Sequence, residues 1–541
     1  MAAPLTLPRP RALSGLAPAL LGASPVLLVL GYLVALAVSS PWERLVAGLG
    51  AVQPIALAGR VLGLAVGATL WAALLAVPTA ALVNLTDLPG RRLWRWLAPL
   101  PLAIPPYVGA LVYLLVLAPG GLVHQALAAL LQRPPYQVAF PSVIYSPAGA
   151  AFVLGLFTYP YLFLVVDSAL QRLNPALEEA AISLGASRWQ VFWRVTLPLL
   201  RPALLGGGLL IFMYGLVDFG VVALLRVQTF TTVIYTFLLA GFDLAAAAAL
   251  SLVLVVLIWG VLLLQRRLLG QAAYTVVTGR LRPRSLTALG RWRWPALLVP
   301  LVPVGLGLVL PLTVLVWHAL TLGGPVGLGL FLQRQLPYLR NSLLVAGLGA
   351  TAALVLSAAL AWWGLRRPGG WWLALALQAG YALPGTVLGL SLVGLSWRLF
   401  PFLYGTPWLL VVAYTILYSA TAFQAVRATF AQIQPALEEA ARSLGHSPLA
   451  AFWRVVVPLA WPGFVGGWTL AFIPAMRELA ATLIIRPPGF DTLPVRVWVH
   501  MQDVGPTDPR GAAVALLLVL AIGLGWVGAL SLRRPLTSDL P

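Results

Sequence analysis

The sequence predicts an all-α polytopic membrane protein of about 12 transmembrane helices, arranged as two parallel six-helix repeats. Two observations carry this prediction. Of the 541 residues, 61% are hydrophobic and only 9% are charged, whereas soluble domains carry about 25% charged residues. In addition, the polar segment 174–203 recurs without a gap at 434–463, with 18 of 30 positions identical. The chain is therefore expected to sit in a lipid bilayer and to be built from a duplicated unit.

The apolar stretches fix the expected number of spans. A helix needs about 20 apolar residues to cross the hydrocarbon core, and twelve stretches meet this length. They lie at 16–38, 61–83, 97–118, 147–168, 199–225, 244–264, 296–318, 343–364, 371–396, 408–428, 460–484 and 511–532. Six fall in each half. We predict a first repeat at 1–264, a basic cytoplasmic linker at 265–294 and a second repeat at 295–541.

The charges indicate orientation and exclude several functions. All 34 basic side chains are arginine, and with the N-terminus inside most of them fall on the cytoplasmic side of the spans, as is typical of membrane proteins. Both termini and both repeated segments are then cytoplasmic, and the net charge of +20 requires no nucleic-acid partner. A chain without lysine has no Walker A phosphate loop, and one without cysteine has no thiol chemistry. We expect no catalytic residues, no cofactor and no metal site.

Each repeated segment is a polar island between apolar runs. Pro175 and Pro435 suit the first position of a helix, and the glutamates that follow favour the positive end of the helix dipole. Gly185 and Gly445 then break that helix before a second short one. We predict a helix-turn-helix knob in each half. An amphipathic hairpin whose glutamates only cap a helix is the alternative, and it does not explain the duplication.

The islands resemble the cytoplasmic signature of permease subunits of bacterial ATP-binding-cassette importers: Glu-Ala-Ala, three residues, Gly, nine residues, Ile-x-Leu-Pro. The corresponding residues are Glu178, Glu179, Ala180, Ala181 and Gly185 in the first copy and Glu438, Glu439, Ala440, Ala441 and Gly445 in the second. Valine replaces the isoleucine in both copies, and Val457 replaces the leucine in the second. The resemblance covers nearly the whole chain and implies the type I importer permease fold, with each island docking onto an ATPase.

The same resemblance implies partners and location. It implies two copies of an ATPase subunit, an extracytoplasmic substrate-binding protein and a multi-pass place in the bacterial inner membrane. Within the superfamily, the fused layout looks most like the ferric-iron permeases. The strings that carry this likeness are Asp218-Phe-Gly220, 229–235 and Arg477-Glu-Leu479 with 482–493. Thiamine and aminoethylphosphonate permeases share parts of them, so both remain alternative substrates.

Charges inside spans point to a translocation path. Asp218 and the pair Arg477-Glu478 occupy repeat-equivalent places in the fifth and eleventh expected spans, and charged groups in membrane helices are costly and usually functional. Carboxylate oxygens suit a hard cation. A structural ion pair between two helices is the alternative. Pro105 and Pro384 interrupt spans three and nine, where either a path lining or a packing kink would explain them.

Other acidic residues carry less weight. Asp167 and Asp243 lie near span ends and are expected to be solvated. Asp87-Leu-Pro-Gly90 resembles a loop signature of major facilitator transporters, the main rival class with six plus six spans. Val83 stands where that signature has glycine, and the rival gives the two islands no role.

Overall fold

The computed structural model describes residues 16–532 except 40, 42, 44–47, 51, 242, 270–285, 367–376, 378, 379, 381 and 382. The helices of the first half are α1 (Leu16–Val38), α3 (Pro54–Leu85), α4 (Arg91–Leu97), α5 (Pro106–Leu117), α6 (Leu122–Leu130), α7 (Pro147–Arg172), α8 (Pro175–Ser183), α9 (Arg188–Val191), α10 (Leu197–Leu199), α11 (Arg201–Val217), α12 (Gly220–Leu224), α13 (Phe230–Leu239) and α14 (Leu244–Leu269). Those of the second half are α15 (Leu298–Val304), α16 (Leu310–Leu320), α17 (Gly324–Arg366), α19 (Gly385–Leu399), α20 (Trp408–Phe430), α21 (Pro435–Ser443), α22 (Pro448–Ala451), α23 (Val457–Met476), α24 (Ala480–Ile485), α25 (Leu493–Asp503) and α26 (Pro509–Leu532).

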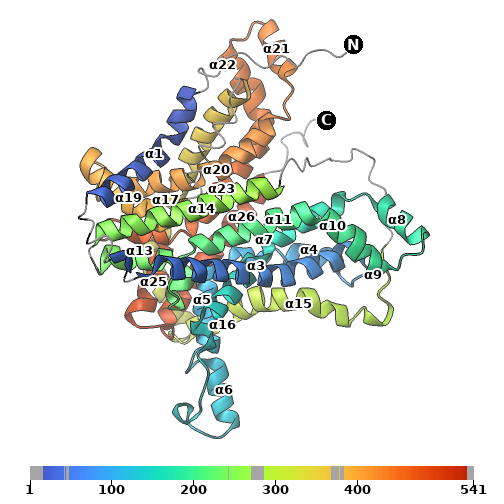
Figure 1. Ribbon diagram of the computed structural model, residues 1–541, viewed down its shortest axis with the longest axis vertical. Helices are drawn as coiled ribbons and strands as arrows, with labels where there is room; N and C mark the ends of the chain where they lie inside the picture. The colour runs from blue at the N-terminus through green and yellow to red at the C-terminus, as the bar shows by residue number, and fades with distance from the viewer. Residues whose placement is uncertain are drawn as a thin grey trace.

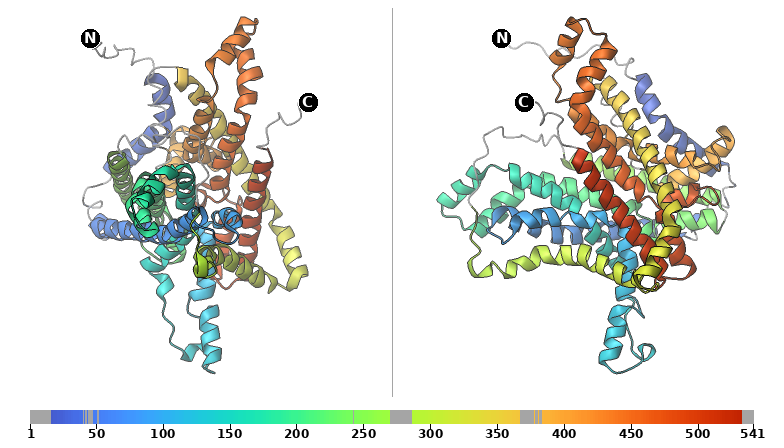
Figure 2. Two further views of the ribbon diagram at one scale, coloured as in Figure 1. Left: turned by 90° about the vertical axis from the view of Figure 1, so that its right-hand side faces the viewer. Right: turned by 180° about the vertical axis from the view of Figure 1, so that it is seen from behind.

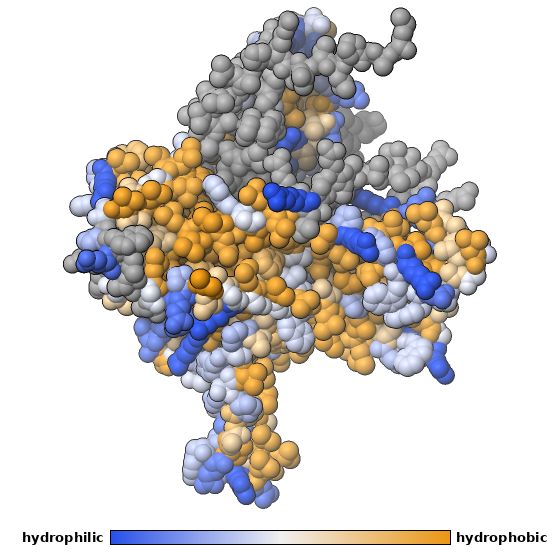
Figure 3. Space-filling view, viewed as in Figure 1, coloured by the Kyte–Doolittle hydropathy of each residue, from blue (hydrophilic) through white to orange (hydrophobic). Residues whose placement is uncertain are grey.

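The helices confirm a multi-pass membrane protein. In the described ranges, nine are long and apolar enough to cross a membrane, or ten when the bent pair 188–199 and 201–217 counts as one span. The other two expected spans correspond to α1 and α19, whose described apolar helices are shorter, 24–38 and 385–399. Large apolar side chains on these helices face outward, and Figure 3 shows apolar residues covering broad areas of the surface in view. Such a surface suits contact with lipid tails.

The two halves repeat one packing pattern. In the first, α3, α7 and α11 pack together, and in the second α17, α20 and α23 do the same. Gly67 and Gly349 lie at corresponding contacts, where a Cβ would come 3.0 Å from the Ala151 Cβ and 2.7 Å from the Tyr414 Cβ. Small residues permit such close approach between membrane helices. The internal duplication therefore extends from the sequence to the helix contacts.

The first helix of each half packs against the other half. α1 contacts α19 of the second half as well as α14 of its own, and α15 and α16 contact α3 and α5 of the first half, as can be followed in Figures 1 and 2. One apolar core consequently contains buried residues of both halves. Two smaller cores are separate from it, one mainly within α3, α7 and α11 and one mainly within α17, α20 and α23. Movement of either half must therefore act on the shared core.

The expected spans 199–225 and 460–484 are not single helices. α11 ends at Val217 and the chain resumes as α12, while α23 ends at Met476 and resumes as α24. Both interruptions fall at the acidic residues predicted to line a path. Pro105 and Pro384 stand directly before the first residues of α5 and α19 as N-cap residues. The prolines therefore mark helix starts, which suits a residue without an amide N–H.

An arm between α5 and α7 is found only in the first half. Residues 118–146 form a projection that contains α6, whereas only residues 400–407 join α19 to α20. Figure 1 shows the arm standing away from the helical body. His124 holds it together, since its Nδ1 accepts from the Gly120 amide at 2.7 Å, its Nε2 lies 2.9 Å from the Val138 carbonyl, and its ring stacks on Phe140.

Candidate functional site

Both islands fold as a helix, a tight turn and a second short helix. The turns contain Gly185 at φ +85° and Gly445 at φ +90°, a conformation in which other L residues are strained. A Cβ at either glycine would meet no atom within 4 Å, so the constraint is the backbone conformation and not crowding. Ser187 and Ser447 then cap the second helix by accepting from the amides of Gln190 and Ala450. The predicted helix-turn-helix geometry is present twice.

A π-helical turn follows in each island. It covers Phe192–Thr196 in the first and Phe452–Val456 in the second, the segments with the shared Phe-Trp-Arg-Val string. Single π turns are rare and frequently occur at functional sites. Leu184 and Leu444, which directly precede the turn glycines, are 89% and 83% exposed at the tips, and Figures 1 and 2 show the islands at separate ends of the molecule. Each island therefore has an exposed leucine at its tip.

The signature glutamates stand at the start of these knobs. Glu178 and Glu438 lie in the first turns of α8 and α21. In the first island the Thr196 hydroxyl donates to Glu178 Oε1 at 2.8 Å, which joins the first helix of the knob to the π turn. Glu179 and Glu439 are exposed beside them. The alanines differ slightly, because Ala441 is buried and Ala181 is half-buried.

A second group of predicted residues lies at the interrupted spans. Asp218 Oδ2 accepts the amides of Val221 and Val222 at 2.9 and 3.3 Å, and Glu478 Oε1 accepts the amide of Ala481 at 3.0 Å. Each carboxylate thus satisfies an amide at the start of the short helix that follows it, as a capping side chain does. The repeat-equivalent acids share a local role that their spacing alone did not reveal.

Arg477 connects the two halves. Its guanidinium donates to the Tyr161 hydroxyl at 2.6 Å and to the Leu102 carbonyl at 3.4 Å, and both partners belong to the first half. The neighbouring Glu478 instead accepts from the Tyr418 hydroxyl at 2.6 Å. The two adjacent charges are therefore held by different partners, so the hydrogen bonds favour a polar junction over a simple ion pair between two helices.

Tyrosines surround these charges. Tyr214 lies within electrostatic range of Arg477, Asp218 and Glu478, and all four side chains are only half-buried. Tyr107 is buried, and its hydroxyl has no hydrogen-bond partner in the described part of the chain. We call Tyr107, Tyr161, Tyr214, Asp218, Arg477 and Glu478 the central cluster. It brings phenol and carboxylate oxygens of both halves together.

The proline-led helices border this cluster. α5 packs against α12, and α19 packs against α24. A Cβ on Gly220 would lie 2.7 Å from the Tyr107 Cβ, and one on Gly385 would lie 2.7 Å from Glu478 Oε1. Pro105 therefore leads into the helix beside Asp218, and Pro384 into the helix beside Glu478. The structure brings together the path residues that were predicted separately from the two halves.

Asp167 is not solvated as expected. Its side chain is buried, and Oδ1 accepts from Asn84 at 2.7 Å and from Arg95 Nε at 3.2 Å. Hydropathy placed this residue near a span end but could not show that α3 and α4 supply polar partners there. Asp243, which is half-buried, accepts the Ala246 amide at 3.0 Å and so caps α14.

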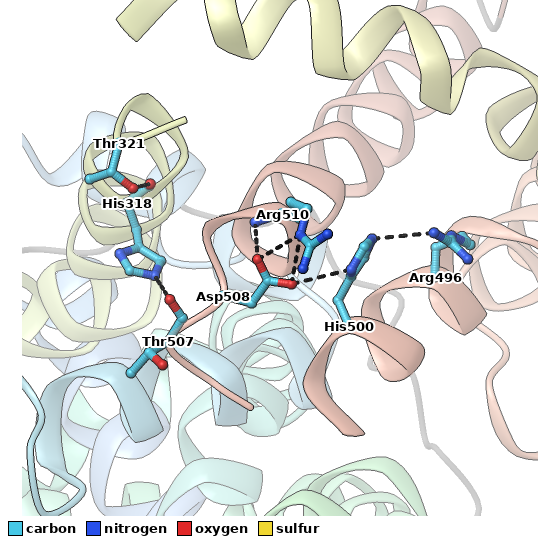
Figure 4. Close-up of polar contacts among 7 residues, drawn as sticks. All are labelled: His318, Thr321, Arg496, His500, Thr507, Asp508 and Arg510. Carbon is cyan, nitrogen blue, oxygen red and sulfur yellow. Dashed lines mark hydrogen bonds and ion pairs between the residues drawn. The ribbon is translucent and has the colours of Figure 1, made fainter. Parts of the chain in front are cut away.

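A polar network between α25 and α26 was missed from the sequence, because the histidines showed no regular spacing. Asp508 is buried and accepts from Arg510 Nε at 3.0 Å, and its Oδ2 lies 3.3 Å from His500 Nδ1. His500 Nε2 lies 3.4 Å from Arg496 Nη2, and His318 reaches the Thr507 carbonyl at 2.9 Å (Figure 4). Burial, with Arg496 beside it, lowers the pKa of His500, so the fold favours the neutral ring.

Comparison with known proteins shows which family the chain belongs to. Residues 68–270 and 353–532 match the model of the binding-protein-dependent transport system inner membrane component, so the family domain is present twice. The chain belongs to this family. Each match includes one island and one interrupted span, which fits a duplicated permease.

The chain is also similar to several characterised or named permeases. The chain is 30% identical over 389 residues to an Fe(3+)-transport system permease of Haemophilus influenzae, covering 70% of this chain and 74% of that protein. It is 27% identical over 411 residues to a ferric transport system permease of Actinobacillus pleuropneumoniae, covering 71% and 58%. A protein of Salmonella paratyphi A named "Putative 2-aminoethylphosphonate transport system permease" is 34% identical over 149 residues, covering 27% and 55%. The two ferric permeases match most of this chain, whereas the phosphonate likeness is confined to a quarter of it.

Proposed function

We propose that this chain is the membrane permease of an importer that carries ferric iron across the bacterial inner membrane. The iron would arrive on an extracytoplasmic binding protein, and two copies of a separate ATPase would supply the energy. The repeats are 1–264 and 295–541 with the linker 265–294 between them, and both termini and both islands face the cytoplasm. The family membership and the two ferric relatives support this assignment.

The central cluster is the observation that supports ferric iron as the transported substrate. Asp218 and Glu478 contribute carboxylates from opposite halves, and Tyr161 and Tyr214 contribute half-buried phenols beside them. Hard cations prefer such oxygen donors. Arg477 bridges the halves at the same place. We infer that the cluster lines a polar segment of the translocation path, through which a cation passes when the halves separate.

The islands couple transport to ATP hydrolysis by the ATPase subunits. Each exposes a leucine tip beside a glycine turn, and the two tips lie at separate ends of the molecule. An ATPase pair that closes on ATP would draw the tips together and act on the shared core. This role needs no nucleotide site in the permease itself.

Aminoethylphosphonate is the second candidate cargo, because a protein of that name matches 149 residues and Arg477 offers a cation in the cluster. A phosphonate would be attracted by Arg477, whereas Fe(III) would be attracted by the two carboxylates. The two cargoes therefore require opposite charges at one place, which makes them separable by experiment.

Reconstituted transport tests the proposal. The permease is placed in proteoliposomes with its ATPase and binding protein, and uptake of radiolabelled Fe(III) is followed with and without ATP. We expect ATP-dependent uptake that excess 2-aminoethylphosphonate or thiamine does not reduce. ATP-dependent uptake of either competitor without iron uptake would show that the competitor is the substrate. Uptake without any ATPase would contradict the assignment to ATP-driven importers.

A further inference from the structure

The linker that joins the repeats contacts the first island. The backbone of Thr287 pairs with the loop after α3, where the Thr287 amide donates to the Leu85 carbonyl at 2.8 Å and the Asp87 amide donates to the Thr287 carbonyl at 3.1 Å. Asp87 also accepts the Leu289 amide at 2.8 Å. This contact gives the Asp87 motif a role that has nothing to do with secondary transporters.

The same threonine reaches the island itself. Arg188, the first residue of α9, donates to the Thr287 hydroxyl at 2.9 Å. Thr287 then lines a groove together with Glu178, Glu179, Ile182, Arg188 and Phe192. Five of these six residues belong to the first island, so the linker supplies one wall of the island's own groove.

The second island lacks the residues that make this contact at the first. Pro448 stands at the position of Arg188 and Val456 at the position of Thr196, and residues 341–430 contain no acidic residue to replace Asp87. The linker also continues directly into the first helices of the second repeat, because only eight positions separate Thr287 from the start of the span Pro295–Leu320. The contact therefore ties the first island to the beginning of the second half.

We propose that linker residues 286–289, here called the strap, form part of the docking surface for one ATPase subunit, so that the two ATPases bind unequal sites. The ATPase at the first island meets an island held by the strap, and the ATPase at the second island meets an island without one. This inference rests on the proposed function, because it takes the ATPase as the occupant of the groove.

The partner's chemistry follows from the groove. Glu178, Glu179 and Arg188 supply both signs of charge around Ile182 and Phe192. A surface that is apolar at its centre and charged at its edges fits a folded protein partner. An anionic lipid surface would favour a cluster of cations without carboxylates, which this groove does not present.

The test isolates one island at a time. Gly445→Asp leaves the first island as the only intact site, and Gly185→Asp leaves the second. Thr287→Val removes the strap hydroxyl while keeping the side-chain shape, and Thr287→Ser keeps the hydroxyl as the matched control. Asp87→Ala removes the carboxylate that accepts the Leu289 amide.

Binding of the purified ATPase to the full-length permease in detergent is the readout. In the Gly445→Asp background, we expect Thr287→Val and Asp87→Ala each to raise the Kd by about 3- to 10-fold, the value of one hydrogen bond. Thr287→Ser should leave it unchanged. In the Gly185→Asp background, none of the three should alter the Kd.

Each other outcome has a defined meaning. An equal change in both backgrounds, no change in either, or tighter binding after Thr287→Val would overturn the strap proposal. If Gly185→Asp and Gly445→Asp themselves leave both ATPases bound, the coupling role of the islands fails instead. Thermal melting and gel filtration of every variant separate lost docking from lost folding, and Thr287→Val is expected to keep the parent melting temperature.

Discussion

The two islands share most of their residues but differ in what surrounds them. Both have the same turn glycine, the same π turn and the same exposed leucine tip. In the part of the chain that the structure describes, the first island has a hydrogen bond from Thr196 to Glu178 and a linker residue at its groove, whereas the second has Val456 in place of Thr196. The comparison teaches that the local geometry of the islands is the same in both copies, whereas their contacts with the rest of the chain differ.

The central cluster shows the same contrast between the halves. Asp218 and Glu478 cap their short helices in equivalent ways, yet Val217 stands where the second half has Arg477. The second half therefore supplies the cation that crosses to Tyr161 and Leu102. The two halves therefore share the capped short helices but differ in the residue that connects them, because only Arg477 and not Val217 can donate hydrogen bonds to the other half.

The largest expected effect comes from the turn glycines. Wild-type protein should retain two ATPases per chain, each single variant Gly185→Asp or Gly445→Asp one, and the double variant none. The turns require positive φ, where a side chain costs about 1–2 kcal/mol, so the turn shifts while the spans remain. Native mass spectrometry counts the subunits.

Gly120→Asp is the matched control for these variants. Gly120 also has a positive φ of +84° and no atom within 4 Å of a Cβ, but it lies in the arm, away from the islands. It should retain two ATPases. Full retention by the double variant would contradict the coupling assignment, and two permease chains per ATPase pair would contradict the proposal that one chain forms the whole permease.

The next-largest effect is expected from variants that distinguish the negative charge of Asp218 and Glu478 from their role as helix caps. Asp218→Asn with Glu478→Gln keeps an acceptor for each short helix but removes both charges, so we expect lost iron uptake with little change in melting temperature. Asp218→Ala with Glu478→Ala also removes the caps and should lower stability by about 1 kcal/mol per site. Uptake assays and thermal melting are run in parallel on both pairs.

The outcomes assign the residues to a role. Equal destabilisation by both pairs would mean that Arg477 depends on the charges, since it is costly to leave a half-buried cation without an opposite charge. Unchanged uptake and stability in the Asn and Gln pair would remove both residues from the path.

A smaller effect is expected at α25, where the two halves differ in their polar residues. Ala240 stands where the second half has His500, so only the second half has the network of Figure 4. Because burial lowers the pKa of His500 in the folded state, the unfolded chain binds its proton at higher pH. The stability due to the neutral ring is present above about pH 6.5 and is lost as the pH falls below that value.

Replacing His500 tests the predicted direction of the change of stability with pH. Melting temperatures measured between about pH 5 and 7.5 should fall toward acid for the wild type and fall less for His500→Gln, which cannot take up the proton. A steeper acid loss in the variant would show that the folded state favours the charged ring, held by Asp508.

The sequence was sufficient for the features that depend on composition and local spacing. Long apolar stretches predicted the spans, and the glycines at 185 and 445 predicted both turns, because positive φ is a local requirement. The breaks at Asp218 and Glu478 were not predicted, since a capping carboxylate inside an apolar run looks the same as a path residue. The partners of Asp167, Arg477 and Thr287 come from distant parts of the chain, and one sequence holds no signal for such contacts.

The smallest effect tests whether the islands' internal difference matters. Thr196→Val gives the first island the residue of the second and removes the donor to Glu178 Oε1. A partly exposed hydrogen bond of this kind contributes about 0.5–1.5 kcal/mol, and because it joins α8 to the π turn its loss should loosen the knob without unfolding the spans. In the Gly445→Asp background, we expect ATPase binding to weaken by no more than about tenfold, whereas in the Gly185→Asp background it should stay the same. Thr196→Ser keeps the donor and should bind as the parent does. If Thr196→Val binds as tightly as Thr196→Ser in both backgrounds, the internal bond is incidental, and any inequality of the two docking sites must come from the strap alone.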